Sequence, residues 1–110
     1  MKMPRMVEGA TLHRPGADPD DYANPGIVVS VRLDYWEGRP EPYELSVTET
    51  AGERRRMSQR YRTPEEASGA LGAVYAAEKS NGTWRVIRPA RTPPPGWESP
   101  RETYHPKTGQ

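Results

Sequence analysis

The sequence predicts an α+β fold: an antiparallel sheet of three to four strands, in the order β-β-β-α-β, with one helix packed on one face and flexible termini. Three observations predict it. Residues 27–36 and 43–48 alternate apolar and polar side chains, which is typical of half-buried strands. Residues 63–82 space their apolar residues as a helix does, between a start signal and a stop signal. The 13 prolines and 10 glycines of the 110 residues cluster outside this middle segment.

The chain has the length of one domain, and its prolines and glycines divide it into three segments. Residues 1–26 are expected to form a flexible arm that is rich in proline and glycine and locally acidic, with Asp18, Asp20 and Asp21. Residues 27–88 are expected to form the α+β domain. Residues 89–110 are expected to form a disordered, proline-rich tail.

The first expected strand, 27–36, places alternate residues on two faces of the sheet. The predicted inward residues are Ile27, Val29, Val31, Leu33 and Tyr35. The predicted outward residues are Val28, Ser30, Arg32, Asp34 and Trp36. After a turn at 37–42, a second strand is expected over 43–48 with Tyr43, Leu45 and Val47 inward.

A third strand is expected over 54–62, after a break at Ala51 and Gly52. The residues expected on its inner face are Arg55, Met57, Gln59 and Tyr61. The residues expected on its outer face are Arg54, Arg56, Ser58, Arg60 and Arg62.

The helix has a capping box, in which the Thr63 hydroxyl and the Glu66 carboxylate satisfy end amides, with Pro64 at the first helical position. Its buried stripe is predicted to be Ala67, Ala70, Leu71, Val74 and Ala77, with Tyr75 beside it. Gly69 and Gly72 are expected to let the helix approach the sheet closely. Asn81 and Gly82 end the helix, and the strand 83–88 is expected to pair with an edge of the three-stranded meander.

The core of this fold is thin. Apolar residues make up 33% of the chain, against about 45–50% in typical globular chains. Dimerisation or docking of an arm over the sheet would stabilise so small a core. Trp36, Trp97 and Tyr104 lie outside it, and at least one of them is expected to pack back onto it.

The composition argues against several classes of function. With 16 basic and 15 acidic residues the net charge is +1, so no global field attracts nucleic acid or a membrane. Cysteine is absent, and His13 and His105 stand near opposite ends, so no metal and no cofactor is expected. No run of about 18 apolar residues predicts a membrane span, and no signal peptide is evident, so a cytoplasmic location without a membrane partner is expected.

The candidate binding site is the outer face of the third strand together with the first. Four arginines of 54–62 project from one face of an extended chain, and guanidinium groups bind phosphates through paired donors. This pattern predicts a nucleic-acid surface, although cross-strand pairs with Glu44 and Glu49 would neutralise it. The predicted nucleic-acid-binding residues are Arg32, Trp36, Arg54, Arg56, Ser58, Arg60 and Arg62.

The stretch from Val31 to about Ala77 resembles the AP2-type and tyrosine-integrase arm-binding DNA-binding domains. The matching residues are Gly52-Glu53-Arg54-Arg55-Arg56 and Tyr61-Arg62-Thr63-Pro64-Glu65-Glu66-Ala67. The resemblance implies a three-stranded sheet that reads DNA and is backed by one helix. The chain departs from that pattern in carrying Glu44 and Glu49 on the second strand and a further strand after the helix.

No catalytic constellation is evident. The serines have no nucleophile elbow or nearby base, and no glycine motif cradles a phosphate, so an enzyme is not expected. Two other segments remain open to interpretation. The proline tail is either a ligand for an aromatic groove or solvated chain, and the acidic arm is disordered, mimics nucleic acid or covers the basic strand.

The sequence therefore predicts a small non-enzymatic binding protein. The first hypothesis is a nucleic-acid-associated accessory protein that uses the basic sheet face. The alternative is a protein–protein interaction or inhibitory module, which binds a host protein or its own copy. Arginine outnumbers lysine 13 to 3, a bias of GC-rich genomes that indicates an actinobacterium or one of its phages.

Overall fold

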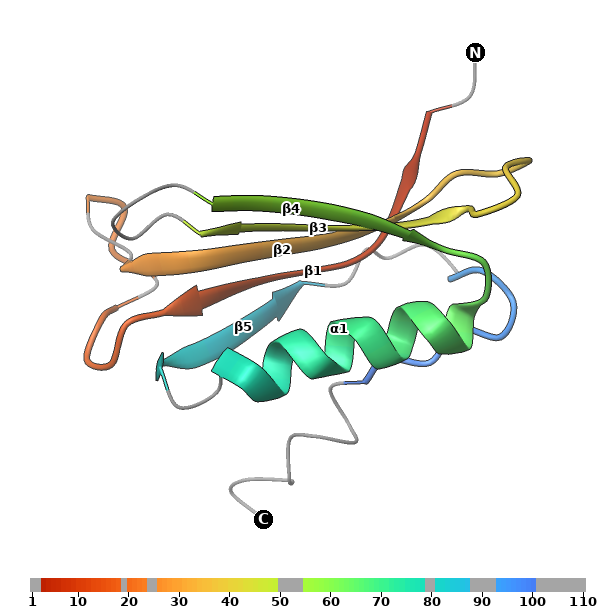
Figure 1. The fold of residues 1–110 in the computed structure, drawn as a ribbon. Coiled ribbons are helices and arrows are strands. Elements are labelled where there is room, and N and C mark those ends of the chain that lie inside the picture. The colour runs from red at the N-terminus through yellow and green to blue at the C-terminus, as the bar shows by residue number, and fades with distance from the viewer. Residues whose placement is uncertain are drawn as a thin grey trace.

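The computed structural model describes residues 3–18, 20–23, 26–49, 55–78, 81–87 and 93–100, without the side chains of Arg55 and Arg56. Its fold is α+β, with a five-stranded antiparallel sheet and one helix on one face (Figure 1). The elements in chain order are β1 (Arg5–His13), β2 (Ile27–Tyr35), β3 (Tyr43–Glu49), β4 (Arg55–Tyr61), α1 (Pro64–Glu78) and β5 (Thr83–Ile87). The strands lie side by side in the order β4-β3-β2-β1-β5.

The first strand corrects the prediction of a flexible arm over residues 1–26. Arg5–His13 forms β1, which lies between β2 and β5 with Ala10 opposite Val31 on one side and Val86 on the other. The expected period-2 pattern is obscured by a register shift between Met6 and Glu8 and by a charged residue, Glu8, that is fully buried. The sheet consequently has five strands instead of three to four.

The last strand also pairs differently from the prediction. β5 pairs with β1 and not with an edge of the β2–β3–β4 meander, because β1 already occupies the free side of β2. Gly82 makes this possible, since a Cβ atom there would collide with the main-chain oxygen of His13. The α1 helix therefore connects the two opposite edges of the sheet, β4 and β5.

The meander and its faces are largely as predicted. Val31, Val47 and Met57 stand in one row across β2, β3 and β4. The predicted inward residues Val29, Val31, Leu33, Tyr43 and Leu45 are all buried. Tyr35 and Val47 are partly buried against the core. Ile27 is exposed at 37%, next to the register shift between Leu12 and His13.

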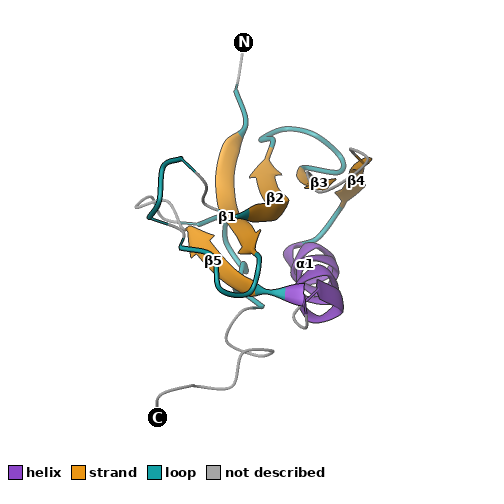
Figure 2. Ribbon diagram, turned by 90° about the vertical axis from the view of Figure 1, so that its left-hand side faces the viewer, coloured by secondary structure: helices purple, strands orange, loops and turns teal. Residues whose placement is uncertain are grey.

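The helix begins with the predicted capping box. The Glu66 amide donates to the Thr63 hydroxyl at 3.1 Å, and the Thr63 amide donates to the Glu66 carboxylate at 3.3 Å. Ala67, Leu71 and Tyr75 are buried. Of the other residues predicted for the buried stripe, Ala70 and Val74 are partly buried and Ala77 is exposed. Figure 2 shows α1 below β3 and β4, on one side of the curved sheet.

A buried polar contact joins the helix to β1. The Tyr75 hydroxyl donates to Glu8 Oε2 at 2.6 Å, and the Trp84 indole donates to the Tyr75 main-chain oxygen at 3.1 Å. The Tyr75 and Trp84 rings meet edge to face with centroids 5.0 Å apart. Because an unpaired carboxylate is costly inside a protein, these bonds fix how the helix sits on β1 and β5.

The described part of the tail, residues 93–100, packs on the domain, which corrects the prediction of solvated chain there. Pro94 and Pro100 are buried, and Trp97 stacks on Tyr43 with ring centroids 6.4 Å apart. The expectation that Trp97 packs back onto the core is thus confirmed. Tyr104 lies outside the described residues.

The two helix glycines do not have the role that was expected of them. A Cβ atom at Gly72 would meet Pro100 of the tail and not the sheet, at 3.0 Å. A Cβ atom at Gly69 would have no neighbour within 4 Å. The prediction that both let the helix approach the sheet closely is therefore wrong, and Gly72 instead makes room for the tail.

Replacing Tyr75 with phenylalanine tests the buried contact. Tyr75→Phe removes the hydroxyl that donates to Glu8 and leaves the ring in place, so the free energy of unfolding should fall by about 1–3 kcal/mol. Urea denaturation measures it. The matched control is Tyr22→Phe, at a residue that is 102% exposed, and it should leave the midpoint unchanged. Equal midpoints for both variants would contradict this account of the core.

Candidate binding surfaces

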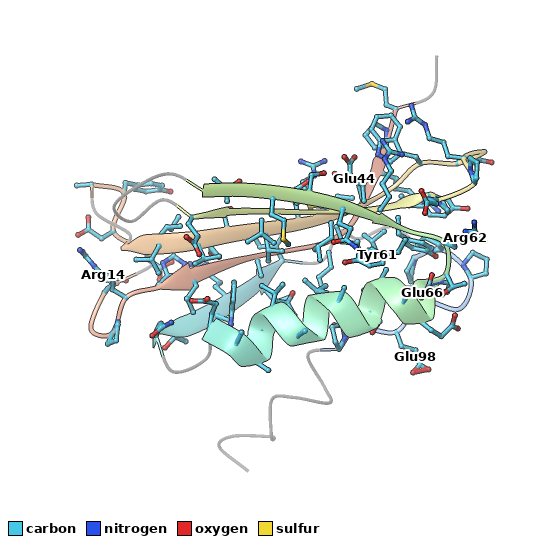
Figure 3. The ribbon with its side chains drawn as sticks, in the orientation of Figure 1. Arg14, Glu44, Tyr61, Arg62, Glu66 and Glu98 are labelled. Carbon is cyan, nitrogen blue, oxygen red and sulfur yellow. The ribbon has the colours of Figure 1, made fainter. Side chains whose placement is uncertain are left out.

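The outer face of the sheet, which lies away from α1, holds several of the residues that the sequence singled out. Asp34, Glu44 and Arg60 stand in one row across β2, β3 and β4. Arg32, Ser46 and Ser58 form the adjacent row. Figure 3 shows Glu44 on this face, with Arg62 and Glu66 beside the start of α1. The sequence therefore placed Arg32, Ser58 and Arg60 on the correct face.

Glu44 is the centre of a cluster formed by Trp36, Ser58 and Arg60. The Trp36 indole donates to Glu44 Oε1 at 2.8 Å, and the Ser58 hydroxyl donates to Glu44 Oε2 at 3.0 Å. An Arg60 nitrogen lies 3.9 Å from Glu44 Oε1. Three of the predicted nucleic-acid-binding residues thus converge on a carboxylate.

Trp36 also joins two cations to this cluster. The Arg39 guanidinium lies 4.3 Å from the centroid of the Trp36 ring, and that of Arg60 lies 5.8 Å from it. Cations at these distances are attracted to the negative face of an indole ring. Arg39 comes from the turn between β2 and β3, and its contact with Trp36 was not predicted.

The cluster keeps Glu44 ionised. The hydrogen bond from Trp36 lowers the pKa of Glu44 most, and the bond from Ser58 and the charges of Arg60 and Arg39 lower it further, against partial desolvation that raises it. Glu44 therefore carries a negative charge among these cations at neutral pH. A phosphate that approaches Arg60 would meet this charge.

Two other arginines of the outer face, Arg32 and Arg85, also have acidic neighbours. Arg32 Nε lies 2.8 Å from Asp34 Oδ1, and an Arg85 nitrogen lies 3.1 Å from Asp20 Oδ1. The predicted acidic arm thus contacts β5 through Asp20, at the sheet edge opposite β4. The contact of Arg60 with Glu44 is the cross-strand pairing that was the alternative to phosphate binding, whereas the Arg32–Asp34 pair lies within β2.

The remaining predicted site residues are Arg54, Arg56 and Arg62. Arg56 stands in register with Thr48, but its side chain is outside the described residues, as is all of Arg54. Arg62 follows β4, is exposed, and donates its main-chain amide to Glu66 at 3.2 Å. The main chain of Arg62 therefore contributes to the hydrogen bonds at the start of α1.

A second surface, the α1–β4 groove, was not predicted. It is a groove of about 240 Å³ between the C-terminal half of the helix and one end of the sheet. Its lining residues are Val29, Val47, Glu49, Met57, Ala73, Val74, Ala77 and Glu78. Met57 is 46% exposed there, although alternation correctly placed it on the helix side.

The groove has a simple structural origin. Two residues, Arg62 and Thr63, connect β4 to α1, so the helix starts close to the strand and then diverges from it (Figure 1). Where the gap widens, the helix presents Ala73 and Ala77, whose short side chains leave it open. The tail with Trp97 covers the opposite end of the helix.

The lining of the groove suits a neutral apolar side chain. Valine, methionine and alanine form most of it, and the carboxylates of Glu49 and Glu78 disfavour an acidic group. Among the described residues, no three histidine or acidic side chains are grouped to hold a metal ion. In the same part of the chain, no helix is long and apolar enough to cross a membrane.

Comparison of the chain with protein-family models, with curated proteins and with solved structures finds no match. The resemblance of residues 31–77 to the AP2-type and integrase arm-binding domains stays a prediction.

The pKa of Glu44 leads to a testable pH dependence. Because its pKa in the folded chain lies below the ordinary value of 4.5, Glu44 stabilises the fold above that value and ceases to do so as the pH falls through its folded pKa. Glu44→Gln removes this titration. The urea midpoint of the variant should therefore fall less than that of the wild type between about pH 6 and about pH 3. An equal fall of the urea midpoint in both proteins would contradict the lowered pKa of Glu44.

Proposed function

We propose that this chain is a non-enzymatic protein-binding module that holds an apolar side chain of a partner in the α1–β4 groove. The observation that carries the proposal is the exposure of Met57 beside Val47 and Val74 in a concave, mainly apolar surface. Concave apolar surfaces with a few charged groups at their rim are common sites of recognition.

The outer face of the sheet also supports protein binding, because it is a poor surface for binding phosphate. Arg32 and Arg60, both predicted to bind nucleic acid, contact Asp34 and Glu44. Phosphate binding there would require these cations to exchange a carboxylate of their own sheet for an external anion, close to the ionised Glu44. Of the two functions that the sequence predicts, protein binding therefore fits the geometry better.

A peptide selection tests the groove. Peptides selected from a random display library for binding to the wild-type chain should bind Ala77→Trp at least about tenfold more weakly, because the indole fills the groove. The matched control is Ala76→Trp. Ala76 is also exposed on α1 but does not line the groove, so its replacement should leave affinity unchanged.

Fluorescence anisotropy with each selected peptide gives the affinities, and circular dichroism confirms that both variants fold. Failure to select any peptide would refute the proposal. Peptides that bind Ala77→Trp as well as the wild type would refute the groove as the site.

Nucleic-acid binding remains a second candidate because of one specific feature. Residues 54–62 contain five arginines and no acidic residue, and Arg62 is exposed. The resemblance to sheet-type DNA-binding domains over residues 31–77 favours the same candidate. Glu44 is the group that opposes it.

A titration with generic duplex DNA tests this candidate. Binding through arginines should weaken steeply between about 50 and about 200 mM salt, because counterions are released from the DNA. Glu44→Gln should strengthen it and Arg60→Ala should weaken it, since these changes remove a repulsive and an attractive charge. Absence of binding by both the wild type and Glu44→Gln at the lower salt concentration would exclude this candidate.

A further inference from the structure

Among the strands that the structure describes, β4 forms one edge of the sheet. Arg55–Tyr61 pairs with β3 along its whole length and lies last in the strand order. The edge of such a strand presents main-chain donors and acceptors that can pair with another extended chain. The opposite edge, β5, is shorter, with five residues against seven, and the Asp20–Arg85 ion pair lies on it.

The arginines of β4 disfavour its pairing with the β4 strand of a second copy of the chain. An antiparallel pair of β4 strands centred on Ser58 would place Arg56 opposite the partner's Arg60. A pair centred on Gln59 would place Arg56 opposite the partner's Arg62. Like charges directly opposite each other destabilise a strand pair, whereas carboxylates in these positions would stabilise it. An acidic extended segment therefore complements β4 better than β4 itself does.

The two faces of β4 require different side chains in such a segment. On the outer face, Glu44 of β3 approaches Arg60 from one side, and a residue of an added strand would lie on the other side of Arg60, away from Glu44. An acidic side chain fits there. On the helix side, a residue next to Met57 extends the apolar row of Val31, Val47 and Met57 at the mouth of the groove. Glu49 and Glu78 disfavour an acidic side chain on that side.

We propose that β4 binds, by strand addition, an extended segment of a partner protein in which apolar and acidic residues alternate. The apolar residues enter the α1–β4 groove beside Met57, and the acidic residues lie along the outer face beside the arginines. This inference rests on the proposed protein-binding function and adds the conformation and the chemical class of the partner segment.

The test uses two nine-residue peptides, one alternating valine with aspartate and the other alternating valine with lysine. The aspartate peptide should bind the full chain at least about tenfold more tightly than the lysine peptide at about 50 mM salt. This preference should shrink at about 200 mM salt, because exposed charges are screened. In NMR spectra of the labelled chain, the amides of residues 55–61 should shift and exchange more slowly with solvent.

Charge reversal on the two edges supplies the matched variants. Arg56→Glu, on β4, should reduce the preference for the aspartate peptide to less than about threefold. Arg85→Glu, on β5, should leave it unchanged. Ala77→Trp should weaken both peptides, because each carries valines that enter the groove.

Three results would overturn strand addition. The first is equal affinity of the two peptides while binding stays sensitive to Ala77→Trp, which would leave the groove function intact. The second is a shift of the β5 amides in place of those of β4. The third is a shift of the β4 amides with duplex DNA and with neither peptide, which would assign the arginines to nucleic acid. Absence of binding by both peptides, together with failure of the peptide selection, would refute the groove function as well.

Discussion

The pairing of β1 on both of its sides is the constraint on which the other contacts depend. With β2 on one side and β5 on the other, β1 contributes the buried residues Ala10 and Leu12 to the core. Glu8 of β1 accepts a hydrogen bond from the Tyr75 hydroxyl, and this bond positions α1. Because β1 separates β2 from β5, the chain after β4 must cross to the far edge of the sheet. The helix that makes this crossing leaves β4 at a widening angle, and the α1–β4 groove follows from it.

The parts of the fold that local chemistry determines could be predicted from the sequence. β2 and β3 follow from strict alternation, and α1 follows from Thr63, Pro64 and Glu66 at its start. β1 could not be predicted, because a register shift, a buried glutamate and the neighbouring proline-rich loop hide its alternation. The packing of Trp97 on Tyr43 was expected only in general terms, since no local pattern identifies the ring that a distant tryptophan contacts.

The same distinction between local pattern and long-range packing applies to the candidate binding surfaces. Alternation assigned Arg32, Ser58 and Arg60 to the outer face, and the neutralising role of Glu44 was one of two alternatives. Which alternative holds depends on cross-strand register, which places Glu44 opposite both Asp34 and Arg60. The groove depends on the direction of a helix axis and on which alanines face the gap, and neither is encoded in a local pattern. The lone Met57 among arginines was the one signal that an apolar position exists there.

The two neighbours of β1 become available at very different times during synthesis. Its β2 partner is made directly after the loop that follows it, but Gly9 pairs with Ile87, which is 78 positions further along the chain. Until β5 emerges from the ribosome, β1 has an open edge, although it becomes an interior strand of the sheet. Contacts of such long sequence separation slow folding and prolong exposure to aggregation. The nascent chain is thus most vulnerable along β1, although this strand is well protected in the finished protein.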